Sequence, residues 1–143
     1  MKITVDTNVL ISATFWKGDS NVIIEKVENK KVELVLSRDI IKEFSEVLAY
    51  KEIQDKIKNK NLEMKRTAEK IEAISSIVEL KQRFNIVKDD PDDNKVIECA
   101  KAGNVKFIIS SDNHLLKIKE FEGIKIITPK EFLKIQDANS NTK

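Results

Sequence analysis

Short runs of apolar and β-branched residues recur along the chain, with segments of helical apolar spacing between them. Runs of about four to eight such residues predict buried strands. The strands predicted in this way are Lys2–Val5, Val32–Leu36, Phe107–Ser110 and Ile124–Ile127. A further strand is expected at Val78–Leu80 or at Asn85–Val87.

The segments between these runs predict helices, and several carry start or stop signals. Ser20 and Ser37 are each placed to cap a helix, because a serine hydroxyl accepts a hydrogen bond from an N–H of the first turn. Thr128-Pro129-Lys130-Glu131 has the capping-box pattern, with proline at the first helical position. Five helical segments are predicted. They are Val22 to Val27 after Ser20, Ile40 to Leu48 after Ser37, Leu62–Val78, Asp92–Ala102 before Gly103, and a last segment that starts at Pro129.

Strands that alternate with helices predict an α/β fold, with a mainly parallel sheet of about five strands and helices on both faces. The 143 residues are the length of one ordinary domain. The polar segment Ala138–Lys143 is expected to form a flexible tail. Ligands of such sheets bind beyond the carboxyl ends of the strands, so residues that follow strands are the first site candidates.

Acidic residues occupy several of these positions. Asp6 follows the first predicted strand, and Asp112 follows the strand Phe107–Ser110. On predicted helices, Glu43 lies at the edge of the apolar face and Asp93 lies between apolar neighbours. Carboxylates rarely face a core unless they are paired or bind a metal ion.

Each acid also has a structural explanation. Asp6 and Asp112 are placed to cap the helices that follow them. Asp93 fits a capping box opened by Asp90, and Glu43 can extend from its helix edge into solvent. Taken together, however, four carboxylates near one edge of a sheet repel one another unless they are protonated or neutralised. Oxygen ligands alone suit Mg²⁺ or Mn²⁺.

Composition narrows the remaining classes of function. There are 26 Lys and Arg against 24 Asp and Glu, so the net charge of +2 predicts no strong non-specific attraction to polyanions. The segment Lys51–Lys70 has seven basic residues against four acidic ones, which makes it either an RNA-binding surface or a solvated helix face. Three glycines exclude a phosphate-binding glycine loop.

The chain has no apolar run near the about 20 residues that span a bilayer, and its N-terminus has no signal-peptide pattern. Its single cysteine, Cys99, suits a reducing compartment. A cytoplasmic protein with no membrane partner is therefore expected.

Other side chains near the predicted site have less specific signals. Trp16 is a candidate for stacking on a base, with ordinary packing as the alternative. Lys17, Arg38 and Lys42 are candidates for phosphate contacts, or are ordinary surface charges. His114, the one histidine, and Cys99 are expected to have structural roles.

Four segments in this order resemble the PIN-domain ribonucleases, in particular the PIN-family toxins of toxin–antitoxin systems, which are VapC-like. The segments are Val5–Ser12, Ile41–Phe44, Asp89–Ala100 and Ser110–Leu116. The resemblance covers Met1 to Ile135 and implies a Rossmann-like α/β/α sandwich. It places a PIN-like nuclease domain at residues 1–137, before the polar tail at 138–143.

The resemblance also implies a metal-dependent endoribonuclease site. The four catalytic and metal-binding acids would be Asp6, Glu43, Asp93 and Asp112, with support from Asn8, Asp90 and Ser110. Mg²⁺ or Mn²⁺ would be the cofactor and would activate water for hydrolysis of an RNA phosphodiester. The family resemblance further implies a homodimer and a small antitoxin partner.

Three other functions compete with this interpretation. A phosphoacceptor signalling domain needs an acidic pair after the first strand, but Asp6 stands alone there. A haloacid-dehalogenase-like phosphatase needs a second aspartate two residues later, where Asn8 stands. A non-catalytic RNA- or protein-binding module would keep the acids as helix caps and would use the segment Lys51–Lys70.

Overall fold

The computed structural model describes residues 1–50, 66, 69–80 and 91–141, without the side chains of residues 91–93 and 139–141. The alternative strand Asn85–Val87 and the candidate Asp90 therefore lie outside the described residues, as does most of the basic segment Lys51–Lys70.

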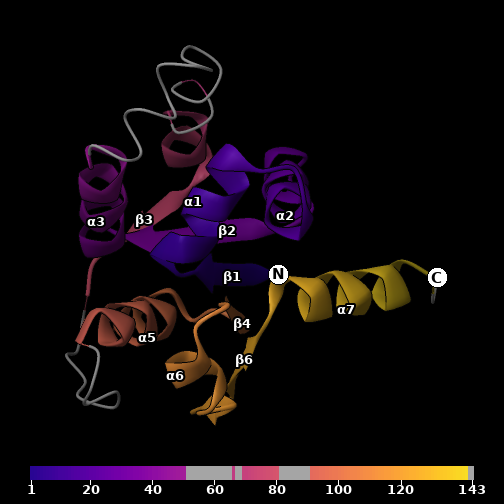
Figure 1. Ribbon diagram of the computed structural model, residues 1–143. Coiled ribbons are helices and arrows are strands. Elements are labelled where there is room, and N and C mark those ends of the chain that lie inside the picture. The colour runs from indigo at the N-terminus through magenta and orange to yellow at the C-terminus, as the bar shows by residue number, and fades with distance from the viewer. Residues whose placement is uncertain (51–65, 67–68, 81–90, 142–143) are drawn as a thin grey trace.

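The described residues form a six-stranded sheet with the strand order β3-β2-β1-β4-β6-β5 (Figure 1). The strands are β1 (Lys2–Val5), β2 (Glu33–Ser37), β3 (Ser76–Val78), β4 (Phe107–Ile109), β5 (Glu120–Phe121) and β6 (Ile124–Ile127). Neighbouring strands are parallel, except that β5 pairs with β6 in an antiparallel hairpin. The prediction of a mainly parallel sheet is confirmed, and the two-residue β5 adds an edge strand that was not expected.

Helices cover both faces of the sheet, which gives the predicted α/β/α sandwich. In Figure 1, α1 and α2 lie on one side of the strands, and α5 and α6 lie on the other. The helices are α1 (Thr7–Phe15), α2 (Asp19–Glu28), α3 (Arg38–Leu48), α5 (Pro91–Gly103), α6 (Asn113–Leu116) and α7 (Pro129–Asn141). None of the helices in the described part of the chain is long and apolar enough to cross a membrane.

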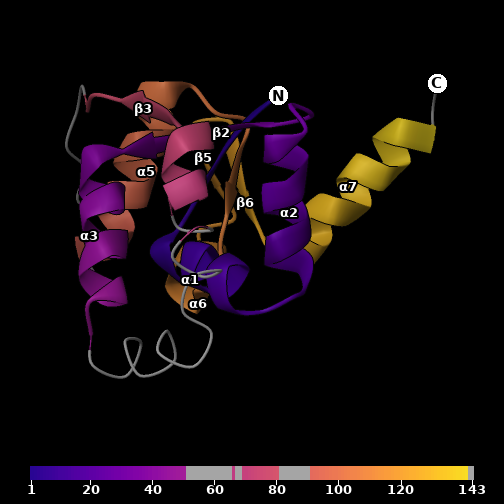
Figure 2. The ribbon, with the colours of Figure 1, turned by 90° about the horizontal axis from the view of Figure 1, so that it is seen from above.

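The central strands are buried because their apolar runs face helices on both sides. Val5 and Ile109 pair across β1 and β4 with no exposed surface, and Leu34 of β2 is equally buried. The ring of Phe107 meets Phe132 of α7 edge-on at 5.9 Å between centroids, which fixes the start of α7 against the sheet. Beyond that contact, α7 leads away from the body of the molecule (Figure 2).

Several predicted boundaries hold, and their capping contacts explain why. Ser37 caps α3 by accepting a hydrogen bond from the N–H of Ile40 at 3.2 Å. Thr128 and Glu131 form the reciprocal capping box at the start of α7. Helix α7 continues to Asn141, through the first residues of the segment predicted as a polar tail.

Other predictions at this level were wrong. Ser20 does not cap α2. Gly18 stands at the N-cap position, without a side-chain hydrogen bond to the helix, and Ser20 lies buried inside the first turn. The helix predicted at Leu62–Val78 ends earlier, because residues 69–74 are helical and Ser76–Val78 forms β3. Helix α1 was not predicted as a separate element, since it has no charged residue and no polar face to produce a helical pattern.

The direction in which successive strands are added to the sheet reverses at its centre. From β1 the chain passes to β2 and β3 on one side, and then to β4 and β6 on the other. In a doubly wound sheet, the crevice between the two strands at this reversal is the usual place for a ligand. Here these two strands are β1 and β4.

Gly103 ends α5 against the sheet, and its missing side chain permits the contact. A Cβ at this position would lie 2.5 Å from Cγ1 of Val35, a buried and β-branched residue of β2. We expect Gly103→Ala to lower the free energy of unfolding by about 1–3 kcal/mol, because the overpacked contact can be relieved only by shifting buried groups. Urea denaturation measures the change.

Gly18→Ala is the matched control for Gly103→Ala. No atom lies within 4 Å of a Cβ built at Gly18, and the backbone there is extended. This change is expected to alter the free energy of unfolding by less than about 1 kcal/mol. Equal effects at the two glycines would contradict the packing argument.

Candidate active site

Asp6 lies directly after β1 and begins the site. Its backbone N–H continues the pairing with β4 by donating to the carbonyl of Ile109 at 3.2 Å. Its side chain caps α1, where Oδ1 accepts a hydrogen bond from the N–H of Val9 at 2.8 Å. The second carboxyl oxygen accepts a hydrogen bond from the hydroxyl of Ser110. Asp6 is therefore held at both oxygens and is only 5% exposed.

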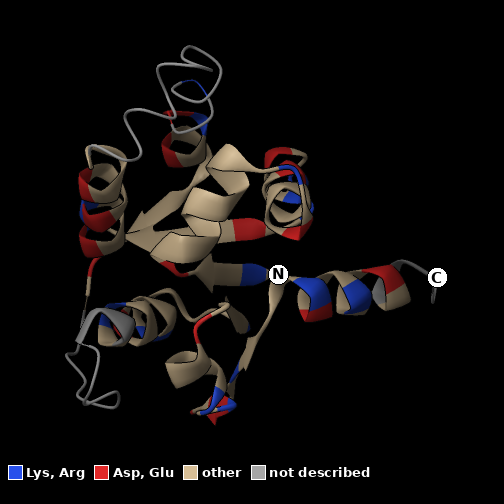
Figure 3. Cartoon of the chain, in the orientation of Figure 1, with Lys and Arg blue, Asp and Glu red and all other residues tan. Residues whose placement is uncertain are grey.

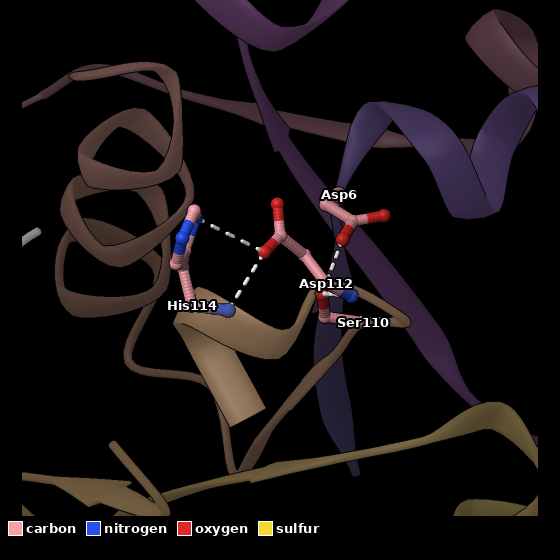
Figure 4. Close-up of polar contacts among 4 residues, drawn as sticks. All are labelled: Asp6, Ser110, Asp112 and His114. Carbon is pink, nitrogen blue, oxygen red and sulfur yellow. Dashed lines mark hydrogen bonds and ion pairs between the residues drawn. The ribbon is translucent and has the colours of Figure 1, made fainter. Parts of the chain in front are cut away.

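Asp112 reaches the same place from β4 (Figure 4). Its backbone N–H donates to Oγ of Ser110 at 2.9 Å, so one hydroxyl links both acidic residues. Its side chain caps the short α6 by accepting from the N–H of His114 at 2.8 Å. Nδ1 of His114 also lies 3.6 Å from Oδ1 of Asp112, so the histidine borders the site on its exposed side.

The electrostatics of Asp6 are unfavourable for a negative charge. Burial raises the pKa of the Asp6 carboxyl above its usual range, and the nearby charge of Asp112 raises it further. Hydrogen bonds from Ser110, from the N–H of Val9 and from the backbone of Ser111 act in the opposite direction. A cation beside the two carboxylates would offset both the loss of solvation and the repulsion.

The donor set suits a hard divalent cation. Asp6 and Asp112 provide carboxylate oxygens, and Ser110 provides a hydroxyl. Mg²⁺ and Mn²⁺ prefer such ligands, and Mg²⁺ is commonly bound through one or two carboxylates together with substrate phosphate and water. The residues present therefore fit the metal ion that the sequence predicts.

The other two predicted acids are placed less completely. Glu43 lies half-buried on α3, where Oε2 is 3.8 Å from Nζ of Lys95 in α5. Asp93 lies in the first turn of α5, but its side chain is outside the described residues. Within the described part of the chain, no three Asp, Glu, His or Cys side chains form a group that could hold a metal ion. The four-acid site therefore stays a prediction.

The predicted supporting and basic residues lie on several different elements. Asn8 is exposed in the first turn of α1, and Lys42 is exposed on α3. Lys17 lines a cavity of about 320 Å³ beside Ser111. Arg38 lines a second cavity of about 230 Å³, where Asp39 and Glu79 make the surroundings acidic. Figure 3 shows basic and acidic residues interleaved along α3 and α7, while α1 has none.

Cys99 has the buried surroundings that the sequence suggested, whereas Trp16 stays open to either stacking or packing. Cys99 is fully buried, and burial raises the pKa of its thiol to about 11, so it is not a reactive thiolate at neutral pH. Its sulfur lies 3.5 Å from Oγ1 of Thr4. Trp16 packs edge-on against Phe15 at 5.9 Å but stays 52% exposed.

Sequence reasoning missed the residues that β6 and α7 bring to this edge. Thr128 and Lys130 line the same cavity as Lys17 and Ser111. In the sequence they are evident only as parts of a helix-capping box, and nothing in that pattern indicates a cavity.

Comparison with known proteins places this arrangement in a family. The PIN domain family matches residues 2–114, most of the chain, and the protein belongs to this family. PIN domains are typically nucleases and generally use divalent metal ions. None of the curated proteins matches the sequence.

The fold also has a counterpart among solved structures. It is similar to the crystal structure of PAE2754 from Pyrobaculum aerophilum, with a TM-score of 0.57 and 14% sequence identity. The match covers 96% of this chain and 99% of that chain. At this identity the likeness concerns the fold alone.

The charge on Asp6 makes a testable contribution to stability. Because its pKa is raised in the folded protein, the folded state binds this proton more tightly than the unfolded chain does. Ionisation therefore lowers the free energy of unfolding as pH rises from about 4, the unfolded pKa, through the raised folded value. In metal-free buffer, the melting temperature of Asp6→Asn relative to the parent should increase over this range and then level off. Asparagine remains neutral and can still accept from Val9.

Thermal unfolding in EDTA between pH 4 and 8 measures this difference. Asp137→Asn, an exposed change on α7, is the control and should follow the parent at every pH. A constant difference between Asp6→Asn and the parent would show that the charge of Asp6 does not affect folding.

Proposed function

We propose that this PIN-domain protein is a metal-dependent endoribonuclease that hydrolyses RNA phosphodiester bonds with bound Mg²⁺ or Mn²⁺. The observation that carries the proposal is the pair Asp6 and Asp112, brought together through Ser110 at the carboxyl ends of β1 and β4. Glu43 and Asp93 complete the proposed acidic site from α3 and α5.

The chain's own residues position the site. Asp6 is fixed by the N–H of Val9 and the hydroxyl of Ser110, so its carboxylate is oriented before any ligand binds. His114 and the N-terminus of α6 hold Asp112 from the solvent side. When bound between these carboxylates, a divalent cation supplies Lewis-acid activation of water and neutralises charge on the phosphate.

A second function is a non-catalytic RNA- or protein-binding module on the same fold. The observation that favours it is that Asp6 and Asp112 both cap helices, so each has a structural role without a metal ion. The two roles are compatible, because a carboxylate that accepts one N–H keeps further lone pairs. Activity measurements distinguish the two functions.

Cleavage of a single-stranded RNA in Mn²⁺, followed by gel electrophoresis, is the direct test. The parent protein should cleave, and EDTA should abolish cleavage. The substitutions Asp6→Asn, Glu43→Gln, Asp93→Asn and Asp112→Asn should each lower the rate at least about 100-fold, because loss of a ligand charge weakens both metal binding and stabilisation of the transition state.

Matched controls separate ligand loss from a general change of charge. Asp92→Asn alters the neighbour of Asp93 in the same turn of α5, and Asp137→Asn alters an exposed acid on α7. Both should keep near-parental rates. Parental cleavage by Asp93→Asn would remove this residue from the site, and absence of cleavage by the folded parent would favour the binding module.

We also propose, from the family resemblance, that the protein is a toxin that forms a homodimer and pairs with a small antitoxin, and, from its sequence composition, that it is cytoplasmic. The apolar residues from which we expect a dimer surface, around Ile53, Ile57 and Leu62, lie outside the described residues. Sedimentation velocity at 5–100 µM, a range of about 20-fold, should show a concentration-dependent dimer. A monomer throughout this range would contradict the proposed assembly.

A further inference from the structure

A cavity opens beside the acidic pair at the carboxyl edge of the sheet. It has a volume of about 320 Å³ and lies between the end of α1, the start of α2, and the segments after β4 and β6. Ser111 joins it to the candidate active site, because this residue lines the cavity and its backbone also contacts Asp6. A ligand bound in the cavity would therefore lie next to Ser111 and close to the proposed active site.

One wall of the cavity is aromatic. Trp16 is 52% exposed, and its edge-on contact with Phe15 holds the ring in place. An indole ring that stays half exposed loses part of the free energy that burial of its apolar surface would provide. Aromatic rings exposed in this way commonly bind ligands. Every nucleobase has a face that can stack on it, at about 1–3 kcal/mol per base.

The other walls are polar, with basic and hydroxyl groups. Lys17 and Lys130 are both exposed and reach the cavity from different segments, one after α1 and one from the first turn of α7. Asp19 is the one acid among the lining residues. Two ammonium groups near an aromatic ring match a base with phosphates on both sides.

The size of the cavity and access to the face of Trp16 limit which form of nucleic acid can bind there. Ligand pockets usually measure about 300–1,000 Å³, so this cavity is at the lower limit and suits one nucleotide. A base can reach the face of Trp16 only when it is not stacked on its neighbours in a duplex. The exposed Ser111 adds a hydroxyl group to the lining, whereas the hydroxyl of Thr128 is bonded to Glu131 in the capping box.

We infer that this cavity is a subsite for one unpaired nucleotide of single-stranded RNA, adjacent to the scissile phosphate. The base stacks on Trp16, and Lys17 and Lys130 bind the flanking phosphates. The inference rests on the proposed nuclease function and adds to it the place on this chain where one nucleotide of the substrate binds.

Binding is measured without cleavage, by titrating the protein in EDTA with a 12-nucleotide single-stranded RNA of mixed sequence. Trp16 is the single tryptophan of the chain, so its intrinsic fluorescence reports directly on the cavity. We expect saturable quenching by single-stranded RNA and little quenching by the same sequence as a duplex.

Variants assign the contacts, with affinity read by anisotropy of fluorescein-labelled RNA. Trp16→Ala should weaken binding about 5- to 100-fold, and Trp16→Phe, which can still stack, should recover most of the loss. Lys17→Gln and Lys130→Gln should each reduce the slope of log K against log salt concentration by about 0.7, the value for one phosphate contact on a single strand. Lys31→Gln, an exposed lysine before β2, should leave the slope unchanged.

The outcomes distinguish this subsite from the nuclease activity. Quenching with the expected variant effects, in a protein that fails to cleave RNA in Mn²⁺, supports the subsite and removes the catalytic proposal. The subsite proposal is overturned if Trp16→Ala cleaves RNA with the parental KM. It is also overturned if RNA binds to the parent protein without a change in Trp16 fluorescence. Thermal unfolding of each variant verifies that it is folded. If Trp16→Ala does not fold, Trp16→Phe tests the stacking contact instead.

Discussion

The parallel pairing of β1 with β4 is the contact on which the rest of the site depends. Val5 and Ile109 are partners in this pairing, and the N–H of Asp6 extends it by one further hydrogen bond to Ile109. Because the strand order reverses between these two strands, their carboxyl ends border the crevice where ligands of a doubly wound sheet usually bind. Two residues more than 100 positions apart, Asp6 and Ser110, meet in it through a hydrogen bond.

Asp6 and Asp112 place two carboxylates close together where Asp6 is almost fully buried. Hydrogen bonds to Asp6 offset part of the free-energy cost of its charge. Asp6 loses hydration and lies near the charge of Asp112, and both effects raise its pKa. The N–H groups at the start of α1 and the hydroxyl of Ser110 oppose them. Capping and ligand binding are thus not rival roles, since capping holds the carboxylate where a cation or phosphate can meet it.

The sequence supported much of the fold and the first elements of the site. Apolar runs located the central strands, and serine and threonine caps located the starts of α3 and α7, because these signals act within a few residues. The position of Asp6 and Asp112 after strands correctly indicated one edge of the sheet. Helix α1 escaped notice because its polar residues are uncharged and do not gather on one face. The strand expected at Val78–Leu80 is β3, which begins two residues earlier than predicted because a three-residue strand has too short a pattern.

The sequence by itself therefore determined the class of fold, the order of most of its elements and the acids that follow the central strands. Only the tertiary structure decided which strand ends are neighbours, and so that Ser110 bridges Asp6 and Asp112. It also brought Trp16, Lys17 and Lys130 around one cavity, although they come from segments more than 100 residues apart. The reason is physical: local patterns reflect hydrogen bonds and burial within one element, whereas the site arises from the packing of several elements at one edge of a sheet.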